Sequence, residues 1–99
     1  MAKGFEMPDN HQRLHAKIFG RVQGVNFRFY TRLTAAQIGL KGWVRNRADG
    51  SVEVVAEGTP KQLAELIQFL NKGPESAFVS RVEIDWLAAT GEFADFQIN

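Results

Sequence analysis

Alternating hydrophobic and polar residues predict a β-strand that begins at Leu14. Leu14, Ala16 and Ile18 occupy every second position, which is the spacing that brings side chains to one face of a sheet. The strand runs into a turn bracketed by Gly20 and Gly24, after which the apolar residues follow a helical period. The first predicted unit is therefore a strand, a short glycine turn and a helix.

The predicted helix runs from about Asn26 to Leu40, and Gly39 is placed to end it. Its apolar residues form two rows, which together make a stripe broad enough for a helix that lies on a sheet. We expect both rows, including their aromatic residues, to face the core. The rows are Phe27, Tyr30, Thr34 and Ile38, and Phe29, Leu33, Ala36 and Leu40.

A β-hairpin is predicted in the middle of the chain. Two strand-like runs, residues 42–47 and 51–57, flank Asp49-Gly50, a dipeptide typical of tight hairpin turns. In the second run Val52, Val54 and Ala56 occupy every second position, and Glu53 and Glu57 fall between or after them. We therefore expect the apolar residues to face the core and Glu53 and Glu57 to face the solvent.

A second helix has clear start and stop signals. Thr59 is the expected N-cap, Pro60 occupies the first helical position, and Gln62 completes a capping box. Gly73-Pro74 should end the helix. Its predicted core stripe consists of Leu63, Leu66, Ile67 and Leu70.

The end of the chain predicts two more strands, over residues 81–86 and 93–98. In the first of these, Val82, Ile84 and Trp86 are expected to face inward. The element order is βαββαβ with an added terminal strand. With right-handed crossovers, this order predicts a ferredoxin-like α/β (α+β) sandwich, in which two helices cover one face of an antiparallel sheet.

Composition limits the size and the partners of the protein. The 99 residues suffice for one domain, which we expect over residues 14–99 after a flexible polar arm at residues 1–13. Twelve Lys and Arg residues against eleven Asp and Glu residues give a net charge of +1, which does not favour nucleic-acid binding. The sequence has no apolar run of membrane-spanning length, and residues 1–13 lack the apolar stretch typical of a signal peptide. We expect a cytoplasmic monomer without nucleic-acid or membrane partners.

The glycine turn is the strongest candidate for chemistry. A helix N-terminus presents free backbone N–H groups, and Arg28 lies in the first turn, where its guanidinium can bind two oxygens of an anion. The turn lacks the lysine and hydroxyl of a P-loop and the glycine spacing of a dinucleotide site. It suits a single phosphoryl group bound by the amides of Gln23, Gly24, Val25 and Asn26 together with Arg28. The structural alternative is a glycine-rich connection with an exposed arginine.

Asn46 is the second candidate, because a carboxamide at the end of a strand can donate and accept hydrogen bonds and so orient a water molecule. The structural alternative is a turn residue. His11 and His15 have no evident partner carboxylate, and the sequence shows no acidic cluster, so no metal site is predicted. The absence of cysteine excludes disulfides and thiolate chemistry.

Three blocks of the chain together resemble the acylphosphatase family. They are GRVQGVNFR from Gly20 to Arg28, GLKGWVRN from Gly39 to Asn46, and DGSVE from Asp49 to Glu53, and the closing DFQI from Asp95 to Ile98 is also similar. The resemblance covers about Leu14 to Asn99. It implies hydrolysis of acyl phosphates to a carboxylate and inorganic phosphate, without a metal or a cofactor.

By the same resemblance, Arg28 and the loop amides would bind the phosphoryl group, and Asn46 would orient the attacking water. The alternative is a non-catalytic ferredoxin-like module that binds a small ligand or RNA. RNA readers of this fold place exposed aromatic residues on their central strands, and residues 51–57 contain none. A third possibility is a domain derived from the acylphosphatase unit of a larger carbamoyl-transfer protein.

Overall fold

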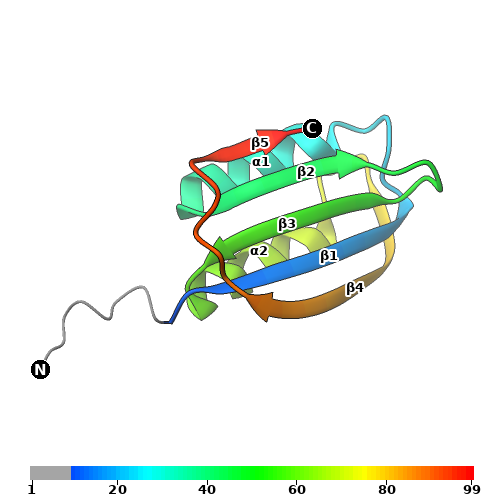
Figure 1. Cartoon of the computed structure of the whole chain (residues 1–99). Helices are drawn as coiled ribbons and strands as arrows, with labels where there is room; N and C mark the ends of the chain where they lie inside the picture. The colour runs from blue at the N-terminus through cyan, green and yellow to red at the C-terminus, as the bar shows by residue number, and fades with distance from the viewer. Residues whose placement is uncertain (1–9) are drawn as a thin grey trace, which may run out of the picture.

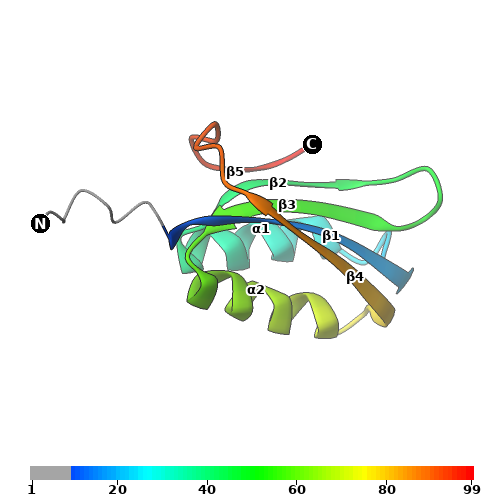
Figure 2. The ribbon, with the colours of Figure 1, turned by 60° about the horizontal axis from the view of Figure 1, so that its bottom comes forward.

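A computed structural model describes residues 10–99 as a five-stranded sheet covered on one face by two helices (Figures 1 and 2). The strand order is β4-β1-β3-β2-β5. The elements are β1 (Gln12–Arg21), α1 (Phe27–Ile38), β2 (Lys41–Asn46), β3 (Val52–Gly58), α2 (Pro60–Lys72), β4 (Phe78–Ala88) and β5 (Phe96–Ile98).

This arrangement confirms the predicted ferredoxin-like sandwich. All neighbouring strands are antiparallel except β2 and β5, which are parallel, so the short final strand makes the sheet mixed. β1 begins at Gln12, before its predicted start at Leu14. Residues 1–9 of the predicted N-terminal arm lie outside the described residues.

The core lies between the sheet and the helices, as the alternation predicted. Its largest contributions come from inward residues of β1 and β3 and from the stripe of α2. The predicted capping box of α2 is present, with Thr59 accepting a hydrogen bond from the Gln62 N–H. Fully buried members include Leu14, Ile18, Val52, Val54, Leu63, Leu66 and Leu70.

The prediction for the buried face of α1 was partly wrong. The helix buries Phe27, Thr31 and Ala35, which follow one another at intervals of four residues. Phe29, Tyr30 and Leu33 are instead exposed, because only one narrow stripe of the helix meets the sheet. Residues of both predicted rows therefore leave an apolar surface open to solvent.

The two tryptophans lie on opposite faces of the sheet. Trp86 lies opposite Leu14 and so on the helix-covered face, but it is half-exposed because β4 is an edge strand. Trp43 lies opposite Val55 on the other face, where it is partly buried beneath the Arg45 guanidinium, 5.1 Å from the ring centroid. Val82 and Ile84 do pack against the core as predicted.

The uncovered face of the sheet buries two carboxylates that the sequence pattern placed in solvent. Glu57 is only 7% exposed, because the segment after β4 crosses this end of the sheet (Figure 1). Its carboxylate accepts hydrogen bonds from Arg13 Nε at 2.7 Å and from the backbone N–H groups of Thr90 and Gly91, each at 2.9 Å. Burial acts to raise the pKa of Glu57, but these hydrogen bonds outweigh it and lower the pKa.

Glu53 is buried in the same way, with an exposed fraction of 6%. His15 Nε2 lies 2.6 Å from one carboxylate oxygen, and Arg45 Nε donates to the other at 2.7 Å. The prediction that His15 has no carboxylate partner was therefore wrong. Burial acts to raise the pKa of Glu53, but the hydrogen bonds from His15 and Arg45 outweigh it and lower the pKa.

Candidate active site

The glycine turn between β1 and α1 doubles back through two left-handed residues. Gly24 has φ 75° and Asn26 has φ 65°. Within residues 10–99, Asn26 is the only residue other than glycine with a positive φ, a conformation that asparagine tolerates better than most residues. Such backbone strain is frequently found at functional sites.

The start of α1 presents backbone donors without protein acceptors. The first hydrogen bond of the helix is donated by the Tyr30 N–H to the Asn26 carbonyl at 3.1 Å, and Asn26 makes no side-chain cap. Among the described residues, no hydrogen bond is donated by the backbone N–H groups of residues 23–29. No acidic residue lies in the first turn of α1, so the positive end of the helix dipole is uncompensated.

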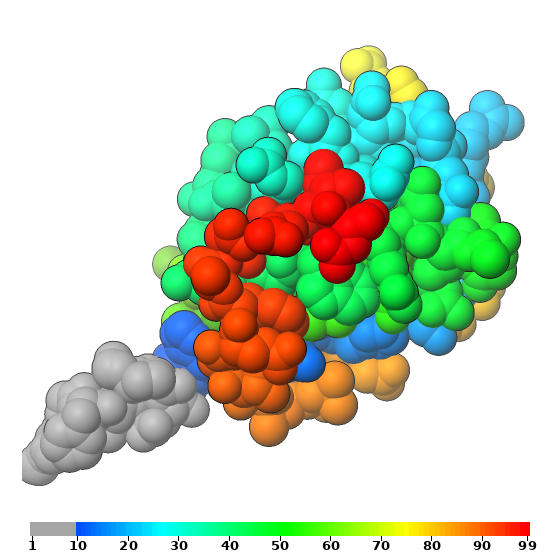
Figure 3. All heavy atoms as spheres, turned by 45° about the horizontal axis from the view of Figure 1, so that its top comes forward, coloured from blue at the N-terminus to red at the C-terminus, as the bar shows by residue number. Residues whose placement is uncertain are grey.

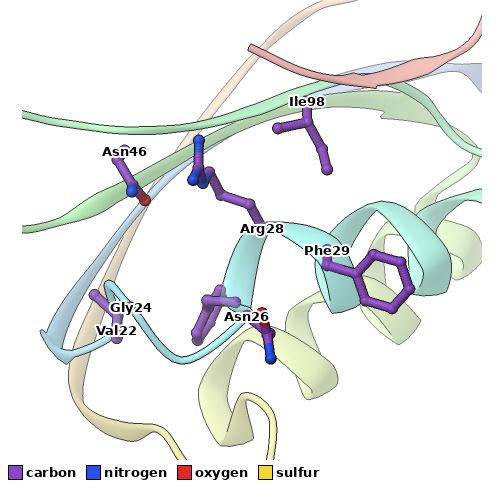
Figure 4. Close-up of a pocket in the computed structure, with 8 residues that line it drawn as sticks. Val22, Gly24, Asn26, Arg28, Phe29, Asn46 and Ile98 are labelled. Carbon is purple, nitrogen blue, oxygen red and sulfur yellow. The ribbon is translucent and has the colours of Figure 1, made fainter.

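A cavity of about 280 Å³ brings the two candidate side chains together (Figure 4). Arg28 reaches it from the first turn of α1, and Asn46 from the last residue of β2. Figure 4 shows the Arg28 guanidinium extended from the helix toward the sheet, with Asn46 to one side of it. The lining residues are Val22, Gly24, Asn26, Phe27, Arg28, Phe29, Asn46 and Ile98.

Arg28 is the only charged residue in this lining. Among residues 10–99 it forms no ion pair and no side-chain hydrogen bond, whereas four other arginines are paired with carboxylates, namely Arg13, Arg45, Arg47 and Arg81. Its planar guanidinium can therefore bind an anion that approaches the free N–H groups of the turn.

The turn is tied to the hairpin that follows Asn46. The Gln23 side-chain amide donates to the Arg47 carbonyl at 2.8 Å and to the Ser51 carbonyl at 2.9 Å. Arg47 in turn contacts the buried Glu53 at 3.4 Å. Gln23 thus links the loop that precedes Arg28 to the strand end that carries Asn46.

Not every predicted site residue borders the cavity. Those that border it are Gly24, Asn26, Arg28 and Asn46. Gln23 instead donates hydrogen bonds to the hairpin, and Val25 packs against the core. Four further lining residues were not predicted, because strand and helix periodicity indicates burial and not proximity to a site; they are Val22, Phe27, Phe29 and Ile98. The hydrogen bonds of Gln23 to the hairpin could not be predicted from residue spacing, because their acceptors lie 24 and 28 residues further along the chain.

Comparison with known proteins decides what kind of protein contains this site. A family model described as acylphosphatase matches residues 14–98. The chain belongs to the acylphosphatase family. It is therefore an enzyme, a hydrolase with acylphosphatase activity, and the alternative of a non-catalytic binding module is set aside.

The similarity extends over nearly the whole domain. An acylphosphatase of Pasteurella multocida is 53% identical over 81 residues, which are 82% of this chain and 90% of that relative. The structure of an acylphosphatase from Coxiella burnetii superposes with a TM-score of 0.87 at 35% identity, covering 92% of this chain and 95% of that one. For the acylphosphatase from Bacillus subtilis the TM-score is 0.86 at 31% identity, over 89% and 98% of the two chains.

Two further observations concern the described part of the chain. None of its helices is long and apolar enough to cross a membrane. Within residues 10–99, no three His, Cys, Asp or Glu side chains are grouped so that they could hold a metal ion. The expected cytoplasmic location and monomeric state stay predictions.

Proposed function

We propose that acyl phosphates are hydrolysed in the cavity between the start of α1 and the end of β2. In this proposal Arg28 and the N–H groups of the turn bind the phosphoryl oxygens, and Asn46 orients the attacking water. One observation supports this proposal. Arg28, Asn46 and the N–H groups of the turn, which have no acceptor among the described residues, lie around the same cavity. A guanidinium fork and a helix N-terminus are both donors suited to phosphate.

The reaction needs little beyond charge stabilisation and alignment. The water oxygen forms a bond to phosphorus, the bond from phosphorus to the acyl oxygen breaks, and its electron pair leaves with the carboxylate. A phosphoryl oxygen accepts one proton of the water, so the products are the carboxylate and dihydrogen phosphate. A carboxylate is a stable leaving group and needs no general acid. The loose transition state is stabilised mainly by hydrogen-bond donors to the three equatorial oxygens of the phosphoryl group.

The role of Arg28 is tested by a substitution that keeps the positive charge but removes the planar pair of N–H donors. Arg28→Lys should lose nearly as much activity toward benzoyl phosphate as Arg28→Ala, because an ammonium cannot bind two oxygens in the same plane. We expect a fall in kcat/KM of about 10²- to 10³-fold for both variants. The measurement is steady-state hydrolysis, with circular dichroism to check folding.

The matched control is Arg32→Lys, one helical turn further along the exposed surface of α1 and outside the cavity lining. It should retain the activity of the unchanged protein. Near-normal hydrolysis by Arg28→Lys would contradict the proposed binding of phosphate by the guanidinium fork.

A further inference from the structure

The cavity has a polar side and an apolar side. Asn46 borders it on one side of Arg28, and Phe29 and Ile98 border it on the other (Figure 4). The space-filling view in Figure 3 shows the C-terminal residues seated beside α1, which brings Ile98 of β5 next to the helix. The exposed fractions are 48% for Phe29 and 40% for Ile98, so their apolar surfaces remain open at the cavity edge.

The direction of the reaction relates these two sides. In an in-line displacement at phosphorus, the attacking water and the leaving oxygen lie on opposite sides of the phosphoryl group. If the phosphoryl group is held by Arg28 and the water by Asn46, the leaving carboxylate points away from Asn46. That direction leads to Phe29 and Ile98.

The chemistry of this side favours an uncharged group. Its lining supplies aromatic and aliphatic carbon, and Arg28, which binds the phosphoryl group, is the only cation of the cavity. A second anion placed against Phe29 would lose hydration without gaining a partner. An apolar acyl chain would instead remove exposed carbon surface from water.

We propose that Phe29 and Ile98 form an acyl-group subsite that selects acyl phosphates with uncharged apolar acyl groups, either medium aliphatic chains or aromatic rings. This inference rests on the proposed function, because the phosphoryl end must be held at Arg28. The two residues determine specificity and take no part in the bond-breaking step.

A competing surface lies on the other side of Asn46. Arg45, Asn46, Arg47 and Ala48 border a second, more open hollow, in which both arginines contact Glu53 and Arg47 Nε also lies 3.8 Å from Asp49. An acyl group that carries its own carboxylate or phosphate would find cations there. That side is where the proposed water attacks, so the in-line geometry directs the leaving group away from it.

The test compares acyl groups of equal acidity and increasing length. Acetyl, butyryl and hexanoyl phosphate release carboxylates of nearly the same basicity, so differences in kcat/KM report contacts of the chain. With partial burial of four additional methylenes, kcat/KM for hexanoyl phosphate should exceed that for acetyl phosphate by about tenfold. Succinyl phosphate, which matches butyryl phosphate in length but carries a carboxylate, should be the poorer substrate of that pair.

Variants then locate the contact. Phe29→Ala should lower the ratio of hexanoyl to acetyl kcat/KM by about threefold or more, and Phe29→Leu should recover part of the ratio. Leu33→Ala is the matched control, since Leu33 is an exposed apolar residue one turn further along α1 that does not border the cavity. The ratio in Leu33→Ala should equal that of the unchanged protein.

Three outcomes would overturn the inference. They are equal kcat/KM for all chain lengths, a preference for succinyl over butyryl phosphate, and a ratio that Leu33→Ala lowers as much as Phe29→Ala. In each of these cases acyl phosphates are still hydrolysed in an Arg28-dependent manner, so the proposed function survives. Its own failure would be recognised by hydrolysis that does not depend on Arg28.

Discussion

At the scale of single residues, Arg28 and Asn46 carry different kinds of chemistry. A guanidinium supplies charge to the phosphoryl group before and during the reaction, whereas a neutral carboxamide adds little to anion affinity. Misplacing a nucleophile can cost about 10² in rate even when binding is intact. The two residues should therefore differ in what their removal changes.

Asn46→Ala should lower kcat by about 10²-fold while the affinity for inorganic phosphate changes by only a few-fold. Asn46→Asp should also fail, because a carboxylate at this position repels the phosphoryl group. Single-turnover hydrolysis and phosphate calorimetry on each variant separate the two effects. If Asn46→Ala lost phosphate binding as severely as Arg28→Ala, the assignment of water to Asn46 would be wrong.

Residue identity was easier to predict than residue environment. Arg28 and Asn46 could be selected from their places at a helix start and a strand end, and both border the cavity. Glu53 and Glu57 were placed in solvent because alternation indicates the face of a sheet but not what covers that face. Their partners, such as Thr90 and His15, come from distant parts of the chain.

At the scale of elements, the site depends on how one turn is held against one hairpin. Gln23 belongs to the turn, and both of its acceptors belong to the hairpin, on either side of Asp49-Gly50. Asp49 stabilises the hairpin itself by accepting hydrogen bonds from the backbone and the hydroxyl of Ser51. The relative position of Arg28 and Asn46 therefore depends on contacts between elements.

Gln23→Ala should weaken phosphate affinity and lower kcat/KM by about tenfold, because the turn loses its anchor to the hairpin. Two lost hydrogen bonds should also reduce the free energy of unfolding by about 1–2 kcal/mol. Phosphate calorimetry and urea denaturation measure the two effects. Gln37→Ala, on the exposed side of α1, serves as the control, and the bracing role is contradicted if both variants bind phosphate equally well.

The boundaries of helices and strands could be predicted where neighbouring residues mark them. Which face of a helix is buried was harder to predict. The capping box of Thr59 and Gln62 and the Asp49-Gly50 turn depend on neighbouring residues, and both are present. The buried face of α1 depends on how much of the helix the sheet can cover, which no local pattern records. The resulting exposure of Phe29 is what leaves an apolar wall beside the site.

At the scale of the whole molecule, the uncovered face of the sheet is held together by charged groups. Glu57 joins β3 to Arg13 of β1 and to the segment after β4, while Glu53 joins β3 to His15 of β1 and to Arg45 of β2. The helices cover only the opposite face (Figure 2). Buried ion pairs and hydrogen bonds between strands therefore stabilise the face that the helices leave uncovered.

The two carboxylates should make stability depend on pH in the acid range. Hydrogen bonds lower the pKa of Glu53 and Glu57 in the folded state below the ordinary value of 4.5. An unfolded chain then binds more protons than the folded one as the pH falls, so protonation favours unfolding. The stabilisation is fully present above the unfolded pKa, and it is lost progressively as the pH falls below 4.5 through the folded pKa.

Urea denaturation of the protein between pH 7 and pH 3 should therefore show a steady loss of unfolding free energy below about pH 5. Glu57→Gln should lower stability at pH 7 by about 1–3 kcal/mol, because Arg13 loses its buried ionic partner and keeps only the exposed Glu92, and it should flatten the acid dependence. Glu65→Gln, on the exposed surface of α2, is the control and should leave both the stability and its pH profile unchanged. An acid profile as steep in Glu57→Gln as in the unchanged protein would show that the buried carboxylate is not its source.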